Sequence, residues 1–183
     1  MKKVIVGMSG GVDSSVTAYL LKKQGYEVEG VSFMLWEARC RNRSTACCAE
    51  EAGLSAAQTA EVLGISHRSV DVRAAFIEAV IEPFADAYQQ ALTPNPCILC
   101  NRFVKFPFLL REAERSGAEC IATGHYARVE RAADGSGRFL LLKGRDPRKD
   151  QSYVLYVLGQ DTLSRLLLPL GAMLKDEVRE IAR

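Results

Sequence analysis

Short apolar runs alternate with longer amphipathic stretches along most of this chain. Strands are predicted for four apolar runs, at residues 4–6, 26–34, 66–72 and 120–123. Helices are predicted for five stretches with apolar residues at helical spacing, at residues 14–24, 50–63, 74–92, 101–116 and from 173 onward. The first strand is a β-branched run without alternation, which is typical of a strand buried on both faces of a parallel sheet. The pattern therefore predicts an α/β domain.

Glycine and proline residues mark the predicted ends and breaks of the helices. Gly25, Gly64 and Gly117 directly follow helical stretches, where a residue with positive φ is favoured. Pro83 lies inside the third stretch and predicts a kink or a break there. The candidate N-caps of the first helix are Asp13 and Ser14. The predicted apolar faces of the first two helices contain Val16, Tyr19 and Leu20, and Leu54, Ala57 and Val62.

The last third of the chain has a different pattern. The turn signal Asp-Gly-Ser-Gly separates two β-prone segments and predicts a hairpin from residues 129–130 and 138–142. We expect residues 1–143 to form the catalytic domain and residues 144–183 to form a loop and a helical segment. The pattern stops in mid-helix at residue 183, as expected for a central region that continues.

Composition narrows the function classes only slightly. The chain has 48% hydrophobic and 25% charged residues and a formal net charge of +2, which is ordinary for a globular protein. The N-terminus lacks a signal-peptide core, and no apolar run is long enough to span a membrane. A cytoplasmic location is therefore expected. In that compartment the six cysteines are thiols, metal ligands or catalytic groups rather than a disulfide framework.

The first chemical signal is the loop S-G-G-V-D-S between the first strand and the first helix. Glycines there let a ligand approach the backbone, and free N–H groups at the helix N-terminus favour an anion. No G-K-[ST] follows, so this is not a Walker A loop. One interpretation is an ordinary Gly-rich turn. The loop also resembles the pyrophosphate loop of ATP pyrophosphatases, in which Asp13 would hold Mg²⁺ against the departing pyrophosphate.

The second signal is a C-x-x-C pair, Cys97 and Cys100, between two prolines and a predicted helix start. A thiolate is favoured near a helix N-terminus. Three interpretations stay open here: half of a zinc site completed by Cys47 and Cys48, a redox pair, or a sulfur-handling centre with Cys100 as nucleophile or persulfide carrier. Cys120 lies in an apolar segment and is expected to be structural.

Four segments together resemble the tRNA-specific 2-thiouridylase family of the MnmA type: SGGVDSS, TPNPCILCN, IATGHYAR and KDQSY, in this order. The resemblance covers nearly the whole chain and corresponds to the family's N-terminal catalytic domain. It implies a doubly wound parallel sheet of the adenine-nucleotide α-hydrolase type, with the hairpin and the helical extension at its C-terminal end. It also implies adenylation of C2 of a wobble uridine in tRNA, with ATP and Mg²⁺, followed by replacement of the oxygen with sulfur.

The resemblance also implies roles for individual residues. The nucleotide site would contain Gly7, Met8, Ser9, Gly10, Gly11, Val12, Asp13, Ser14, Phe33 and Gly124. The target base would meet Asn95, Pro96 and Cys97, and tRNA would contact Lys149, Asp150 and Gln151. Cys100 would be the catalytic nucleophile, and Cys97 would be a second catalytic residue. Many members of the family carry Asp where this chain has Cys97, so an acid–base role of that carboxylate would be filled differently by a thiol.

Two sources of sulfur stay open. One is a cysteine persulfide supplied by a donor or relay protein, but the family's partner cysteine lies beyond residue 183 and no cysteine follows Cys120. The other is sulfide on a [4Fe-4S] cluster held by Cys97, Cys100 and one of Cys47 or Cys48. Two rival functions share the loop: a pyrophosphatase that adenylates a small molecule, and a non-enzymatic module that binds a metal or a cluster.

Charge gives a modest indication of nucleic-acid binding. Residues 101–150 contain eleven Lys or Arg against seven Asp or Glu, whereas the whole chain contains 24 against 22. Two interpretations are open: a basic face around the Cys loop, or an ordinary solvated surface, which the charge alone favours. The members of the basic face would be Arg102, Lys105, Arg128, Arg145, Arg148 and Lys149.

Overall fold

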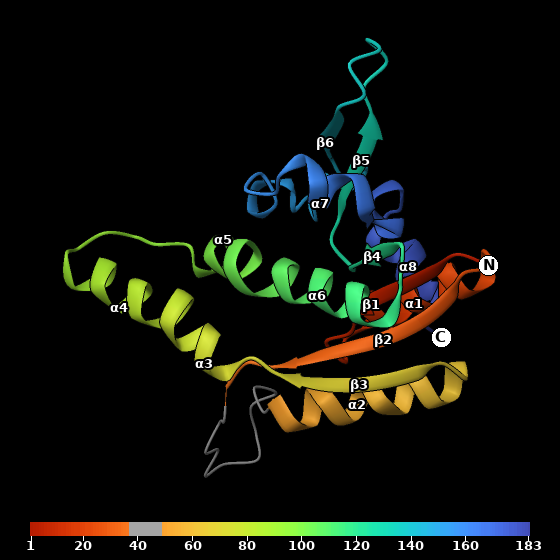
Figure 1. Ribbon diagram of the computed structural model, residues 1–183, viewed down its shortest axis with the longest axis horizontal. Helices are drawn as coiled ribbons and strands as arrows, with labels where there is room; N and C mark the ends of the chain where they lie inside the picture. Colours follow the sequence, from red (N-terminus) through yellow and green to blue (C-terminus); the bar gives the residue numbers. More distant parts are fainter. Residues whose placement is uncertain (37–48) are drawn as a thin grey trace.

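The computed structural model describes residues 1–36 and 49–183, and its core is a five-stranded parallel sheet (Figure 1). The strand order is β3-β2-β1-β4-β7. The strands are β1 (Lys3–Gly7), β2 (Glu27–Met34), β3 (Ser66–Asp71), β4 (Cys120–Ala122) and β7 (Leu166–Leu167). Because the chain moves outward from β1 first to β2 and β3 and later to β4 and β7, the order switches at β1. Ligands bind at such a switch point in open α/β sheets.

Helices cover both faces of this sheet, which confirms the predicted doubly wound α/β fold. They are α1 (Val12–Lys23), α2 (Ala49–Leu63), α3 (Arg73–Phe76), α4 (Glu82–Gln89), α5 (Pro96–Leu99), α6 (Phe106–Ser116), α7 (Gln160–Arg165) and α8 (Lys175–Ile181). Wider π-helical turns join α3 to α4 over Ile77–Ile81 and α5 to α6 over Cys100–Lys105.

The central strand β1 explains the two-sided core. Val4 and Val6 pack with α1 and α2, whereas Ile5 points the other way and packs with Phe106 and Leu109 of α6. All three β1 side chains are fully buried. Successive side chains of a strand face opposite sides of the sheet, so a strand covered on both sides must be apolar throughout.

The apolar faces predicted for α1 and α2 were partly wrong. Val16 is buried as expected, but Tyr19 is exposed. On α2, Leu54 is 64% exposed and Val62 is 86% exposed. The small side chains Ala56 and Ala60 face the sheet instead, because α2 lies close to β2 and β3. The prediction from the spacing of large apolar residues therefore chose the wrong face of this helix as the buried one.

The predicted helix of residues 74–92 is irregular at the place that Pro83 suggested. Helical residues run without a gap from Arg73 to Gln89, and a π-helical turn over Ile77–Ile81 directly precedes Glu82 and Pro83. The predicted helix start at residue 101 was wrong. The helix begins at Pro96, since Asn95 caps it through a bond from the Cys97 N–H to Asn95 Oδ1 (3.1 Å).

The C-terminal third contains the hairpin and adds the last strand to the edge of the main sheet. Strands β5 (Ala127–Arg131) and β6 (Phe139–Lys143) pair antiparallel, as predicted, and the hairpin stands out from the body in Figure 1. Short 3₁₀ turns lie at Ser152–Val154 and Pro169–Ala172. The segment from residue 144 onward supplies β7 to the main sheet and packs α8 on α1. The domain boundary at residue 143 stays a prediction.

No helix within the described ranges has both the length and the apolar character that crossing a membrane requires.

Candidate nucleotide-binding site

A cavity of about 270 Å³ opens where the carboxyl ends of β1, β2 and β4 meet. Seven of the ten residues predicted for the nucleotide site line it: Gly7, Met8, Ser9, Asp13, Ser14, Phe33 and Gly124. Val31, Leu35, Lys105, Thr123, His125 and Gln151 complete the lining. The structure thus brings together the first loop, the end of β2 and the segment after β4, which are distant in the sequence.

The loop holds its shape through its own hydroxyl groups. Ser14 Oγ donates to the Gly11 carbonyl (3.0 Å) and accepts from the Ser9 N–H (3.2 Å). Ser14 is therefore a buried support of the loop rather than a free phosphate ligand. The N-cap of α1 is Gly11, without a side-chain bond, so the caps predicted at Asp13 and Ser14 were wrong.

Gly10 gives the loop its turn. Its φ of +74° lies in the left-handed region, which side chains with a Cβ rarely adopt. Within the described part of the chain, the backbone N–H groups of Gly10 and Gly11 have no hydrogen-bond partner. With the N-terminus of the twelve-residue helix α1 directly behind them, these donors form a site suited to a phosphate group.

Asp13 is held by two donors from the C-terminal third of the chain. Tyr126 Oη donates to Asp13 Oδ1 (2.8 Å), and Lys175 Nζ lies 2.5 Å from the same oxygen. Burial, and then the bond to Asp13, raises the pKa of Tyr126 above its ordinary value, so the phenol stays a donor. Among the described residues, no partner contacts Asp13 Oδ2.

His125 also lines the cavity and is neutral. Its Nδ1 lies 2.8 Å from Thr123 Oγ1, and its ring stacks on Phe106 with the ring centroids 6.1 Å apart. Burial, helped by the nearby charge of Lys105, lowers the pKa of His125 to about 3. The ring therefore offers uncharged hydrogen-bonding atoms and a flat surface to a molecule in the cavity.

The two cysteines lie in the first turns of the helix that begins at Pro96. Cys97 is exposed, and Cys100 is partly covered by the cluster around Val80 and Val104. Burial raises the pKa of Cys100, and the charge of Lys105 opposes this shift. The expectation of a favoured thiolate at Cys100 was therefore wrong, because desolvation outweighs the position near a helix start.

This helix is tied to the predicted tRNA-contacting segment. Asn101 is only 1% exposed, and its Nδ2 donates to the Val154 carbonyl (3.0 Å). Gln151 lines the cavity and accepts a bond from the Tyr126 N–H (3.1 Å). Asp150 accepts a bond from the Gly144 N–H (2.8 Å), which holds the segment in shape.

Three of the predicted tRNA contacts are exposed at the surface: Asn95, Cys97 and Lys149. Lys149 is exposed beside Asp150, and Asn95 is exposed at the start of the Cys helix. Pro96 between Asn95 and Cys97 is half-buried. Their roles stay predictions.

Sequence reasoning missed several residues of this site. Lys105 had been predicted only for a basic surface, and no role had been given to Thr123, His125, Tyr126 or Lys175. The segment after β4 was a recognisable signal, because polar residues at the carboxyl end of a buried strand lie at the binding edge of the sheet. For Lys175 no local signal exists, since it follows Asp13 by 162 positions.

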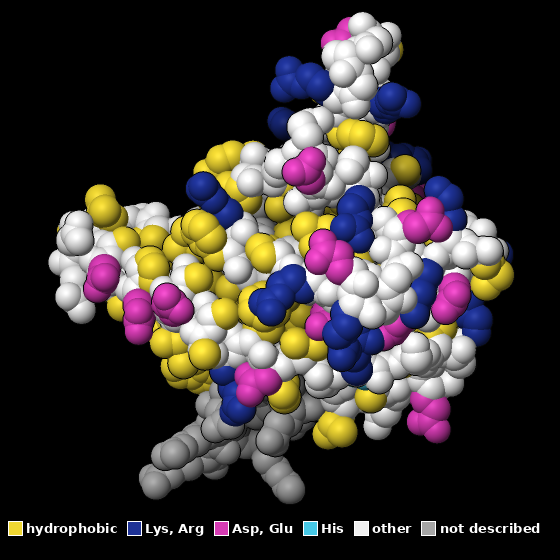
Figure 2. Space-filling model, viewed as in Figure 1, with side chains coloured by type: hydrophobic (Ala, Val, Ile, Leu, Met, Phe, Trp, Pro, Cys, Tyr) yellow, Lys and Arg dark blue, Asp and Glu magenta, His cyan; other side chains and the backbone are white. Residues whose placement is uncertain are grey.

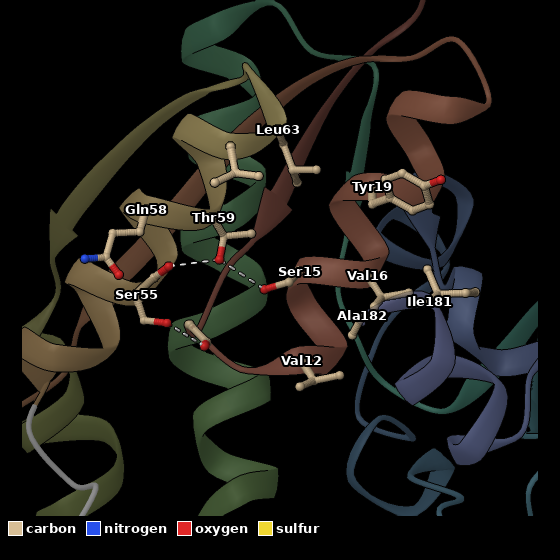
Figure 3. A pocket seen from close by; sticks show the side chains of 12 residues that line it. Val12, Ser15, Val16, Tyr19, Ser55, Gln58, Thr59, Leu63, Ile181 and Ala182 are labelled. Carbon is tan, nitrogen blue, oxygen red and sulfur yellow. Dashed lines mark hydrogen bonds between the residues drawn. The ribbon is translucent and has the colours of Figure 1, made fainter.

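A larger hollow of about 460 Å³ lies on the other side of α1, between α2 and α8 (Figure 3). Its walls include Val16, Tyr19, Leu63 and Ile181, and among the described residues that line it Tyr19 alone is titratable. Ser55 lies at its edge and donates to the Gly10 carbonyl (3.0 Å), which supports the loop from behind. The smaller cavity is the candidate active site, because it contains a carboxylate, a lysine and an imidazole at the carboxyl edge of the sheet.

The described residues include no group of three or more His, Cys, Asp or Glu side chains arranged to hold a metal ion. Cys47 and Cys48, predicted as further thiolate ligands, lie outside the described residues, as does Cys40. The cluster therefore stays a prediction.

Comparison with known proteins agrees with this site. The family model described as the tRNA methyl transferase HUP domain matches residues 2–183. The chain belongs to this family. The HUP-domain chain is 50% identical over 183 residues to tRNA-specific 2-thiouridylase MnmA 1 of Caldanaerobacter subterraneus, covering 98% of this chain and 50% of that protein. It is 48% identical over 186 residues to tRNA-specific 2-thiouridylase MnmA of Geobacter metallireducens, covering 99% of this chain and 50% of that protein.

This HUP-domain chain thus spans about half the length of the curated relatives it matches. Among solved structures it resembles a predicted subunit of tRNA methyltransferase from Methanocaldococcus jannaschii, with a TM-score of 0.55 and 16% identity. That match covers 100% of this chain and 74% of the other. At such low identity it shows a shared fold.

Proposed function

We propose that this chain is the ATP-binding, uridine-activating part of a tRNA-specific 2-thiouridylase. The observation that carries the proposal is the S-G-G-V-D-S loop at the carboxyl end of the central strand β1. It stands in a chain about half identical to proteins named as thiouridylases. The proposed reaction joins the C2 oxygen of the wobble uridine to the α-phosphate of ATP, with departure of pyrophosphate.

The cavity and the adjoining part of the loop have suitable groups for each part of the nucleotide. Gly10 and Gly11 do not line the cavity, but they follow Ser9 directly, and their free N–H groups, backed by α1, suit the pyrophosphate that leaves. Phe33 and neutral His125, which both line the cavity, suit a flat, uncharged base. Because the loop is held from behind by Ser14 and Ser55, its donors need no rearrangement when charge develops on the phosphates.

Asp13 fits the proposed Mg²⁺ by its chemistry. It is a carboxylate at the phosphate end of the cavity, its side chain is 36% exposed, and its Oδ2 has no partner among the described residues. When bound there, the ion would neutralise phosphate charge. Asp13 would supply one oxygen ligand, while Tyr126 keeps the other oxygen oriented.

The acceptor side of the proposed site begins at the Cys helix. Asn95 and Cys97 are exposed at its start, where an unstacked uridine could approach. Lys105 lies on the same helix and reaches the nucleotide cavity. The helix thus runs from the surface, where a base would arrive, to the wall of the cavity where it would be activated.

Phosphate contacts to tRNA would come from scattered basic side chains. In Figure 2, Lys and Arg side chains are interspersed with Asp and Glu over the visible face, and several lie around the hairpin. Arg131 and Arg138 of the hairpin region are exposed, as is Lys149. Such a surface supports modest, salt-dependent binding.

Sulfur delivery is proposed for Cys100, with sulfur from a donor or relay protein. The outer sulfur of a persulfide on Cys100 would attack the activated C2 and expel AMP. Attack of a second thiol on Cys100 Sγ would then break the S–S bond, release the 2-thiouridine and leave a disulfide, which an external thiol would reduce before the next cycle. Burial raises the pKa of Cys100 although the charge of Lys105 opposes the shift, so the thiol form is favoured at neutral pH. In the Cys helix, Cys97 and Cys100 are two of the three thiolates proposed for a [4Fe-4S] cluster, and the third, Cys47 or Cys48, lies outside the described residues.

The test is the identity of the nucleotide product in the presence of tRNA. The protein is incubated with [α-³²P]ATP, MgCl₂, sodium sulfide as the source of sulfur, and either a tRNA transcript with uridine at the wobble position or the same transcript with cytidine there. We expect AMP and pyrophosphate only with the uridine transcript. Release of ADP, or AMP formation that is independent of tRNA but depends on a small-molecule acceptor, would contradict the proposal in favour of another ATP-using enzyme.

A further inference from the structure

Lys175 is placed at the pyrophosphate loop although it comes from the far end of the chain. Its Nζ lies 2.5 Å from Asp13 Oδ1 and 5.7 Å from the centroid of the Tyr126 ring. The Lys175 side chain is only 16% exposed. A largely buried ammonium group in contact with the loop is unusual for a lysine, since most are solvated.

The base of this lysine is firmly anchored. Its backbone N–H donates to Asp146 Oδ2 (3.1 Å), and Asp146 is itself buried. Helix α8, which begins at Lys175, is fixed to α1 by Val178 packing with Val16. Because Asp146 and the packing of α8 hold the backbone of Lys175, only its flexible side chain can move from one neighbouring anion to another.

The charges at this point favour an exchange of partners. Asp13 Oδ1 accepts bonds from both Tyr126 and Lys175, so the carboxylate keeps one donor when Lys175 leaves. Among the described residues, Asp13 is the ionic partner of Lys175. The ammonium group therefore needs another anion when it leaves Asp13. The terminal phosphates of a nucleotide carry more charge than one carboxylate and would bind where the loop N–H groups point.

We propose that Lys175 is a phosphate-binding residue of this site, which exchanges Asp13 for the pyrophosphate part of the nucleotide. The inference rests on the proposed function, because it assigns the lysine to the same ATP. The exchange also releases Asp13 from its ion pair at the moment when a divalent cation accompanies the phosphates. Lys175 thereby keeps the acidic loop neutral while no nucleotide is bound.

The experiment measures binding of the two products separately. Isothermal titration with AMP and with inorganic pyrophosphate, each in MgCl₂, is done on the wild type, Lys175→Met and Lys175→Arg. Lys23→Met serves as the matched control, since it removes the same charge from the opposite end of α1. We expect Lys175→Met to weaken pyrophosphate binding at least tenfold and to change AMP binding less than twofold. Lys175→Arg should restore most of the pyrophosphate affinity, and Lys23→Met should behave as wild type.

Thermal unfolding of the same variants distinguishes a ligand from a structural clamp. If Lys175→Met weakens AMP and pyrophosphate binding equally, or binds pyrophosphate like wild type, the inference is wrong while the proposed function stands. If the wild type binds neither ATP nor pyrophosphate, the proposed function fails, and the inference fails with it. A melting temperature of Lys175→Met close to wild type, together with selective loss of pyrophosphate, supports the exchange.

Discussion

Gly124 lies directly against the backbone of Asp13. A Cβ added at Gly124 would sit 2.9 Å from the Asp13 carbonyl carbon and 3.0 Å from the Ser14 nitrogen, which is closer than real Cβ contacts allow. The segment after β4 therefore needs glycine at this position to reach the loop. The backbone of the loop and the backbone after β4 pack so closely that no Cβ fits between them at Gly124.

Gly124→Ala should displace the loop and weaken nucleotide binding. Overpacking of this kind costs about 1–3 kcal/mol, and the strain falls on the loop that binds the phosphates. We expect at least a tenfold loss of ATP affinity in a titration. Gly159→Ala is the control, because an added Cβ there meets nothing within 4 Å. If Gly124→Ala binds ATP as tightly as the wild type, the loop can move to accommodate the added Cβ without losing affinity, and the prediction is wrong.

Acidification should destabilise the protein through His125. Burial lowers the pKa of His125 to about 3, whereas in the unfolded chain its pKa returns to about 6.5. Between these values the unfolded state binds the proton and the folded state does not, so stability falls as pH falls from 6.5 toward 3. The loss is at most about 1.4 kcal/mol for each pH unit in this window.

The measurement is urea unfolding of the wild type and of His125→Gln at pH 7.0 and pH 5.5. His67 also has a pKa lowered by burial, but it is present in both proteins, so the difference between them isolates His125. The variant should lose less stability than wild type between the two pH values. Equal losses would mean that His125 accepts its proton in the folded state.

The two thiols of the Cys helix should differ in reactivity. Cys97 is exposed, whereas burial raises the pKa of Cys100. At pH 7.5, iodoacetamide should alkylate Cys97 several-fold faster than Cys100, because the thiolate is the reacting species. Peptide mapping by mass spectrometry at short times measures both rates in one sample.

Lys105→Met should slow the alkylation of Cys100 further. The charge of Lys105 opposes the upward shift of the Cys100 pKa, so removing it leaves less thiolate at a given pH. The rate at Cys97 provides the internal reference. A Cys100 rate that rises in this variant would indicate that exposure, and not charge, limits the reaction.

Asn101 should be a main support of the site. Its Nδ2 joins the Cys helix to the Val154 carbonyl, and the side chain is buried. Asn101→Ala leaves that carbonyl without its partner, which costs about 1–3 kcal/mol. Urea denaturation should show the loss as a lower midpoint with an unchanged slope. Ser116→Ala, at the far end of α6, is the control, since its hydroxyl bonds only within the helix.

The sequence predicted the frame of this molecule better than its side-chain contacts. Local signals predicted the fold and the phosphate loop. They are the β-branched run at Val4, the glycines of the loop and the glycines that end helices. The buried face of α2 was missed because Ala56 and Ala60 are small, and their burial depends on how closely the sheet approaches. Small side chains carry little signal in a hydrophobic pattern.

The missed contacts to Asp13 join distant parts of the chain. Tyr126 reaches Asp13 because the segment after β4 lies beside the loop, and Lys175 reaches it because α8 packs on α1; no local sequence pattern predicts either contact. The lowered pKa of His125 likewise depends on the ring of Phe106 and on the burial created by the whole fold. The helix start at Pro96 was hidden by prolines that usually interrupt helices, although Pro96 itself occupies the first position of one.

The π-helical turn over Cys100–Lys105 sets the angular position of the thiols. A turn of this kind holds one residue more than an α-helical turn, and each residue of an α-helix advances about 100° around the axis. Deleting one residue between Arg102 and Val104 would restore regular winding and turn Cys97 and Cys100 by about that angle relative to Phe106. A protein engineer who transplants this segment must therefore copy its length as well as its residues, because a single gap would aim the same sulfur atoms at a different neighbour.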